Sequence, residues 1–118
     1  MNIVLEDSVT DEIRTKYILL TLDTFYFKNA DATKTAYCLV DNLSFQNMLY
    51  SDRWLDLHNN LIKNYGQKNW RYCLDAIEHL EGKWQGAADS FYRNMKKRIM
   101  EFQDQDPGEA WSPLLERE

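Results

Sequence analysis

Hydrophobic and polar residues alternate along the first third of the chain and then change to a helical spacing. Residues 17–27, YILLTLDTFYF, are rich in β-branched and aromatic residues with a rough period of two, and residues 34–40, KTAYCLV, share this pattern. Asn29 and Asp31, which lie between the two segments, are typical turn residues. The pattern therefore predicts two strands joined as a β-hairpin.

Both faces of this hairpin carry apolar side chains. Strict alternation places Leu20, Leu22 and Tyr26 on one face and Leu19, Phe25 and Phe27 on the other. A two-stranded hairpin is marginal in water, so each face needs a cover. Helices later in the chain can cover one face. The other face needs a preceding helix, a third strand formed by residues 3–5, or a second copy of the chain.

A short helix is predicted just before the first strand. Ser8 precedes Asp11 and Glu12. A serine hydroxyl can accept a hydrogen bond from an unpaired amide at a helix start, and carboxylates stabilise the positive end of a helix. We therefore expect a helix over residues 9–16.

From residue 51 onward, apolar residues recur at steps of three and four, which predicts three helices. Ser51 is the expected cap of the first, which ends at Gly66; Gly82 breaks the second, and Pro107 ends the third. Because the connections are short, neighbouring helices should run antiparallel. The predicted fold is α+β: an N-terminal short helix and a β-hairpin packed on a C-terminal bundle of three to four antiparallel helices. The apolar stripes are Trp54, Leu57, His58, Leu61, Ile62 and Tyr65; Trp70, Cys73, Leu74, Ile77, Leu80 and Trp84; and Ala88, Phe91, Met95, Ile99 and Phe102.

The length and charge of the chain divide it into a body and a tail. A chain of 118 residues fits one domain, and a formal charge of −5 is concentrated at its end. Residues 1–100 hold 13 acidic and 13 basic side chains, whereas the last 18 residues hold six acids against Arg117. We predict a single domain over residues 1–103 and an acidic tail over 104–118. Trp111, Leu114 and Leu115 could anchor the tail to the body, and the Ser112-Pro113 pair predicts a short terminal helix.

The cysteines and the apolar runs bear on location. No apolar run approaches the roughly 20 residues needed to cross a bilayer, and no basic segment followed by an apolar one opens the chain. Cys38 and Cys73 lack metal-type spacing and have apolar neighbours, as buried free thiols do. We expect a cytoplasmic protein with no membrane span, no metal and no cofactor.

Catalysis is not expected from this sequence. The candidate groups are His58, His79, Asp75 and Glu78, and none belongs to a recognised catalytic motif. Glu78 and His79 are adjacent, so on a helix they point about 100° apart. A metal hydrolase would require His58 and His79 to approach one another. We expect no enzyme.

Protein binding is the favoured function. A hairpin face without a helical cover would expose Leu19, Phe25 and Phe27, and the tail offers Trp111 and Leu114, so these five residues are the candidate contacts for a homo-oligomer or another protein.

Single-stranded nucleic-acid binding is the alternative. Residues 59–72 contain Lys63, Lys68 and Arg71 and no acid, with Tyr65 and Trp70 available in principle to stack on bases. A neutral body with an acidic tail lacks the positive charge usual for that function.

Two resemblances concern longer stretches. Residues 54–61 and 73–77 partly resemble the tetratricopeptide repeat, but the turn is three residues too long and no second copy follows, so no repeat function is implied. The segments KYILLTLDTF, TAYC, LHNNLIKNYGQKNWRYCLDAIEHLEGKWQG and DSFY, spanning residues 10–95, resemble small uncharacterised proteins of marine T4-like phages. That resemblance implies expression inside an infected bacterium. It implies no catalytic residues.

Overall fold

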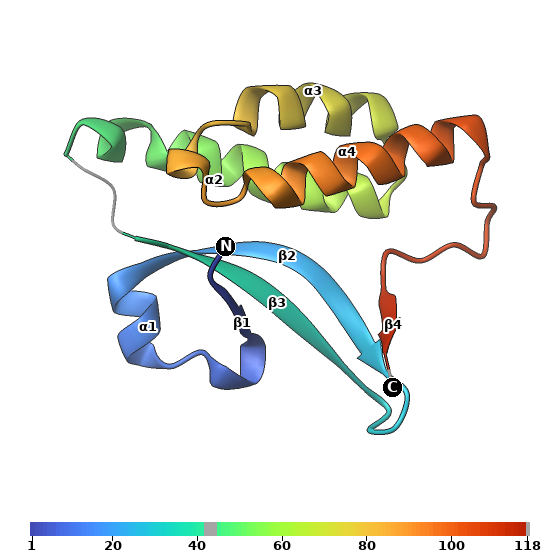
Figure 1. Cartoon of the computed structure of the whole chain (residues 1–118), viewed down its shortest axis with the longest axis horizontal. Coiled ribbons are helices and arrows are strands. Elements are labelled where there is room, and N and C mark those ends of the chain that lie inside the picture. The colour runs from blue at the N-terminus through green and yellow to red at the C-terminus, as the bar shows by residue number, and fades with distance from the viewer. Residues whose placement is uncertain (42–44, 118) are drawn as a thin grey trace.

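The computed structural model describes residues 1–41 and 45–117, and only the backbone of residues 45–49. It contains a four-stranded sheet and a layer of three long helices (Figure 1). The predicted α+β class is confirmed. In chain order the described elements are β1 (Ile3–Leu5), the 3-10 helix η1 (Glu6–Ser8), α1 (Asp11–Lys16), β2 (Tyr17–Phe27), β3 (Ala32–Asp41), α2 (Phe45–Gly66), α3 (Trp70–Leu80), the 3-10 helix η2 (Trp84–Gly86), α4 (Asp89–Asp104) and β4 (Leu115–Arg117).

The sheet has the strand order β1-β3-β2-β4. The predicted hairpin forms its centre, since β2 and β3 pair antiparallel from Tyr17 opposite Asp41 to Phe27 opposite Ala32. Residues 3–5, considered as a cover for one face, instead pair antiparallel with the free edge of β3. β4 pairs parallel with the last three residues of β2. The short strands at both edges therefore widen the sheet without covering either face.

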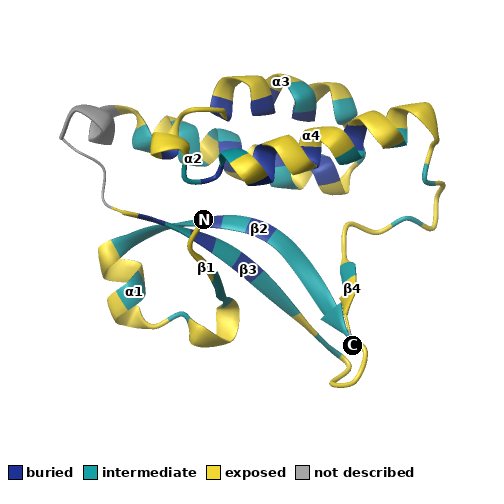
Figure 2. Ribbon diagram, in the orientation of Figure 1, coloured by how far each residue is buried: buried dark blue, intermediate teal, exposed yellow. Residues whose placement is uncertain are grey.

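All three long helices lie on one side of the sheet, and successive helices run in opposite directions (Figure 1). Their inward sides and the facing side of β2 and β3 hold the buried residues (Figure 2). Burying apolar surface there stabilises the fold by about 25 cal/mol for each Å² removed from water. The buried core consists of Leu20, Leu22, Ala36, Cys38, Val40, Leu61, Tyr65, Cys73, Ala76, Ile77, Leu80, Trp84, Ala88, Phe91, Tyr92, Met95 and Ile99, with His58 as its one buried polar residue in the described part of the chain.

Two predicted helix caps are wrong. The first helix is capped by Thr10, whose hydroxyl oxygen accepts from the amide of Ile13 at 3.2 Å, while Ser8 ends η1. Ser51 lies inside α2, which already begins at Phe45. Serine is tolerated within helices as well as at their starts, so its identity alone did not locate the first turn.

The predicted break between α3 and α4 at Gly82 is confirmed, but the predicted place of Trp84 is wrong. Gly82 has a φ of +79°, a conformation that favours glycine, and α3 ends at Leu80. Trp84 was predicted on the stripe of α3, but it lies in η2, where it, Gln85 and Gly86 all have positive φ. This local path directs the fully buried Trp84 ring into the core.

The end of the chain also differs from the prediction. Ser112 and Pro113 do not start a helix; the chain continues to β4 and rejoins the sheet beside β2 (Figure 1). The Ser112 hydroxyl accepts from the amide of Leu114, a local turn that competes with helix formation. Among the described residues, no helix combines the length and the apolar character needed to span a membrane.

Candidate functional site

The face of the sheet turned away from the three long helices is the candidate functional site. Burial alternates along β3, where Ala36, Cys38 and Val40 are buried against the helices, so Tyr37 and Leu39 point to the opposite side. Residues paired across strands share a face, which extends the assignment to β1, β2 and β4. We call this surface the outer face; its strand positions are Val4, Tyr17, Leu19, Thr21, Thr24, Tyr26, Thr33, Thr35, Tyr37, Leu39, Asp41 and Glu116.

A β-bulge in β2 determines which residues reach the outer face. Thr21 pairs with Tyr37 and Thr24 with Thr35, so β2 has one more residue than β3 between these pairs. Leu22 and Asp23 consequently both point toward the helices, and the alternation is inverted beyond them. The hydrogen bond between the Thr24 and Thr35 hydroxyls, at 2.9 Å, shows that these two side chains share a face.

The bulge corrects the predicted grouping of the hairpin side chains. Phe25 and Phe27 lie on the helix side together with Leu20 and Leu22, whereas Tyr26 joins Leu19 on the outer face. Strict alternation missed this because it assumes an uninterrupted ladder. Leu19 keeps its predicted place on the face away from the helices.

Phe25 and Phe27 contact cationic side chains. The Arg117 guanidinium lies 5.0 Å from the centre of the Phe25 ring, and the Lys34 amine lies 5.7 Å from that of Phe27. Such contacts are worth about 0.5–1 kcal/mol at exposed sites. The two rings are half-buried and belong to contacts within the chain.

The composition of the outer face is unusual for a sheet surface. Its charged strand positions are Asp41 and Glu116, which lie near opposite ends, and the others are Tyr, Leu, Val and Thr. The solvated face of an antiparallel sheet usually carries polar residues, whereas the centres of protein interfaces are depleted of charge and enriched in Tyr. At the hairpin tip the Tyr26 hydroxyl donates to the Asp31 carboxylate at 2.6 Å, a bond that raises the pKa of Tyr26.

Within residues 1–41 and 45–117, the segment containing η1 and α1 is the part that lies on this side of the sheet (Figure 1). It includes Val9 and Ile13, both half-buried. Leu19, Tyr37 and Leu39 are half-buried as well, so the outer face has partial cover and no helix layer comparable to that of the inner face.

Of the two predicted tail contacts, Trp111 packs inside the protein and Leu114 lies on its surface. Trp111 packs against the body, with its ring centre 5.5 Å from the ring centres of Tyr65, Trp70 and Phe102. Leu114 is exposed at 39% of its surface. The return of the tail to the body through Trp111 is therefore confirmed.

Residues 59–72, the predicted nucleic-acid-binding segment, do not leave both of their predicted stacking rings exposed. Tyr65 is buried and Trp70 half-buried in contact with Trp111, so both rings are engaged inside the protein. Lys68 has a left-handed backbone, with φ at 61°, and its amine donates to the Gly108 carbonyl oxygen at 2.5 Å. Lys63 and Arg71 are exposed. Nucleic-acid binding by this segment stays a prediction, without support from the Tyr65 and Trp70 rings on which it was based.

The structure does not bring the four candidate catalytic groups together. His58 is fully buried on α2, while His79, Asp75 and Glu78 lie on α3, with His79 exposed. Within the described residues, no three His, Cys, Asp or Glu side chains are grouped so that they could hold a metal ion.

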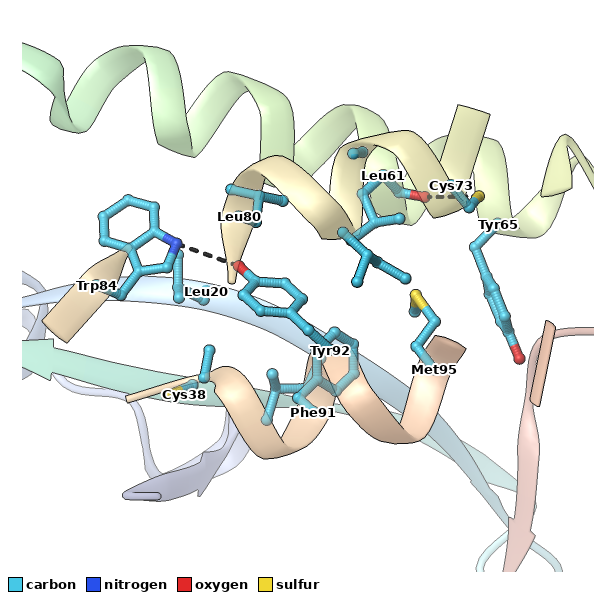
Figure 3. Packing of buried hydrophobic residues seen from close by; sticks show 14 of the residues in the cluster. Leu20, Cys38, Leu61, Tyr65, Cys73, Leu80, Trp84, Phe91, Tyr92 and Met95 are labelled. Carbon is cyan, nitrogen blue, oxygen red and sulfur yellow. Dashed lines mark hydrogen bonds between the residues drawn. The ribbon is translucent and has the colours of Figure 1, made fainter. Parts of the chain in front are cut away.

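His58 instead organises a buried hydrogen-bond chain. Its Nε2 lies 2.6 Å from the carbonyl oxygen of Thr21, which can only accept, so Nε2 carries the proton. Nδ1 then accepts from the Tyr92 hydroxyl at 2.8 Å, and the Tyr92 oxygen accepts from Trp84 Nε1 at 3.1 Å (Figure 3 shows the Trp84–Tyr92 bond). Burial lowers the pKa of His58 and raises that of Tyr92, so both are neutral.

Two small cavities flank an ion pair between the sheet and the helix layer. Arg98 of α4 donates to both carboxylate oxygens of Asp23, at 3.2 and 3.4 Å, and lies 5.6 Å from the centre of the Tyr65 ring. The cavity on one side has a volume of about 100 Å³ and is bordered by Pro113 and Leu114; the other has about 210 Å³ and lies beside β1. Because Asp23 and Arg98 neutralise one another, neither cavity presents a free charge from this pair.

Comparisons with protein-family models, with curated proteins and with solved structures each found no match. The resemblance to phage-encoded proteins therefore stays a prediction.

Proposed function

We propose that this protein is a non-catalytic binding protein that self-associates by packing the outer face of its sheet against the same face of a second copy. The observation that carries the proposal is the Tyr- and Leu-rich surface centred on Leu19, Tyr37 and Leu39, whose charged strand positions lie only near its ends. Location in the cytoplasm, of a host cell if the chain is phage-encoded, belongs to the same proposal and is supported by the two free buried thiols.

Charge favours a second copy over another partner. A two-fold dimer brings each patch against itself, so a charged patch would repel its own copy. The centre of the outer face avoids this, because its charged strand positions, Asp41 and Glu116, lie near its ends, while the chain as a whole carries a formal charge of −5. Two such faces can stack about 10 Å apart, with Tyr17, Leu19, Tyr37 and Leu39 interdigitating.

The test is the oligomeric state of matched lysine variants. We expect sedimentation velocity to show a dimer for the natural chain and at least a tenfold weaker dimer for Thr21→Lys, because a buried amine would lack a partner. Thr21 is half-buried at the centre of the face, and its replacement removes little apolar area. Leu19→Lys should behave in the same way.

Met100→Lys is the matched control. Met100 is exposed at 54% on α4, in the helix layer, and its replacement should leave the dimer unchanged. Circular dichroism verifies that each variant is folded. A natural chain that remains monomeric at several hundred micromolar, or equal weakening by Thr21→Lys and Met100→Lys, would refute self-association through the outer face.

A further inference from the structure

The chain carries, after α4, a segment that binds the body like a separate peptide. We call residues 105–117 the arm. Most of it is exposed; its half-buried residues are Pro107, Trp111 and Leu115, and the last two belong to its two main attachments to the body. In Figure 1 the arm leaves the end of α4 and descends beside the helix layer to the edge of β2.

The first attachment is aromatic. Trp111 meets Tyr65 of α2, Trp70 of α3 and Phe102 of α4 edge-on. Aromatic pairs in such arrangements contribute about 0.5–1.5 kcal/mol each beyond the area that they bury. Figure 3 shows the Tyr65 ring extending from α2 toward the C-terminal part of the chain.

The second attachment is a β-strand. Leu115 to Arg117 pair parallel with Phe25 to Phe27, and the amide of Lys28 donates to the Arg117 carbonyl oxygen at 2.9 Å. The Lys28 amine lies 3.0 Å from the Glu116 carboxylate. Peptides that add a strand to a sheet edge bind in this manner, with main-chain bonds for affinity and side chains for specificity.

A hinge connects the arm to α4. Gln105 is exposed and extended, with φ at −131° and ψ at 102°, and Pro107 prevents α4 from continuing. Gly108, which accepts a hydrogen bond from Lys68 of the body, lies on the arm side of this hinge and therefore moves with the arm. A change of the backbone angles at Gln105 alone would move the whole arm away from its own body. The residues that make the arm's contacts would stay together and could form the same contacts on a second copy.

From these features we infer that the arm exchanges between two copies of the chain, each copy placing its Trp111 against the aromatic cluster of the other and its β4 on the edge of the other's β2. The occupant that these surfaces fit is the chain's own arm, and an exchanged arm remakes the same contacts, so exchange costs mainly the entropy of association. This inference is separate from the proposed dimer, because the arm occupies the edge of β2 and the helix ends and leaves the centre of the outer face, around Leu19, Tyr37 and Leu39, free.

Isotope-mixed cross-linking of the full chain tests the exchange. Unlabelled and ¹⁵N-labelled chains are mixed, incubated at high concentration and treated with a carbodiimide, which joins a lysine amine to a carboxylate in contact with it. Mass spectrometry then separates Lys28–Glu116 cross-links within one isotope from those between isotopes. We expect mixed pairs that increase with concentration toward half of the total.

An internal control lies in the same spectra. Lys34 of β3 and Asp7 of η1 form an ion pair at 2.5 Å that exchange leaves within one chain, so their cross-link should contain one isotope only. Repeating the experiment with Thr21→Lys separates arm exchange from outer-face association, because mixed Lys28–Glu116 pairs should persist when the outer-face dimer is weakened.

Two further variants keep the inference falsifiable. Trp111→Ala should reduce Lys28–Glu116 cross-links of both kinds at least severalfold. Leu115→Ser weakens only the β4 attachment and should reduce them as well, so it serves as a second test if Trp111→Ala does not fold. Single-isotope Lys28–Glu116 pairs at every concentration would overturn arm exchange. So would mixed pairs that are unaffected by both variants.

Discussion

His58 Nε2 lies 2.6 Å from the carbonyl oxygen of Thr21, so a side chain of α2 donates a hydrogen bond to the edge of β2 at a position where none of the described strands pairs with it. The Leu39 amide donates to the Asn2 carbonyl oxygen, so the main-chain groups of Leu39, and of Tyr37 two residues before it, point away from β2. Thr21 lies opposite Tyr37, so its main-chain groups point away from β3. The histidine thus replaces a strand partner. This one bond ties the helix layer to the sheet beside the bulge.

Replacing His58 should strongly destabilise the fold. His58→Leu leaves the Thr21 carbonyl and the Tyr92 hydroxyl buried without this partner, and each unpaired group costs about 1–3 kcal/mol. Urea unfolding should show a loss of about 2–5 kcal/mol. His58→Gln, whose amide can both donate and accept, should recover part of it, and His79→Leu on the exposed side of α3 should change little. Equal losses for His58→Leu and His79→Leu would contradict the role of the buried chain.

Stability should depend on pH through the same residue. Burial lowers the pKa of His58 in the folded state, so the unfolded chain binds the proton more readily between that value and about 6.5. The free energy of unfolding should therefore rise with pH in this window, by at most about 1.4 kcal/mol per unit, and level off above about pH 7. The difference between the natural chain and His58→Gln, measured from pH 5 to 8, isolates this dependence. A difference that is constant with pH would contradict it.

Two glycines should respond in opposite directions to alanine. Gly82 has φ at +79° with open space around it, so Gly82→Ala costs backbone strain of about 1–2 kcal/mol. Gly66 ends α2 in a helical conformation, and an added methyl would meet only Pro113 at 3.9 Å. Gly66→Ala should be neutral or stabilise by up to about 1 kcal/mol. Thermal unfolding of both variants measures the contrast, and destabilisation by both would show that Gly66 is needed for the turn.

Both thiols should be protected in the native chain. Cys38 and Cys73 are fully buried, and burial raises the pKa of Cys73 to about 11 and also raises that of Cys38. A thiol with that pKa is ionised in about one molecule per thousand at pH 8, and only the thiolate reacts. Ellman's reagent should therefore react at least a hundredfold more slowly with the native chain than with the chain in urea. Tyr72→Cys provides an exposed thiol on α3 as a control, and rapid native labelling of two thiols in the natural chain would contradict this burial.

Periodicity located the elements that depend on local interactions. β2 spans residues 17–27 as its alternation predicted, and the buried positions Leu61, Tyr65, Cys73, Ile77, Leu80, Met95 and Ile99 all lie on the predicted stripes. Gly82 ended its helix for a reason intrinsic to glycine, the ease of positive φ. Such features follow from the residue and its near neighbours, so they can be read without the fold.

The candidate site depended on contacts between distant residues. Phe25 and Tyr26 exchange faces because of a single extra residue in β2, and that residue is defined only by the register against β3. Likewise, the tail forms a strand because Leu115 meets Phe25 across 90 positions of sequence, where local preference had indicated a helix.

The amino-acid sequence by itself therefore determined the α+β class, the central hairpin and the apolar faces of the helices, since each follows from spacing along the chain. The tertiary structure alone decided which hairpin side chains remain on the outer face, where His58 makes its bonds and where the arm attaches. The physical reason is that register and strand pairing are set by long-range packing, which no short stretch of sequence encodes.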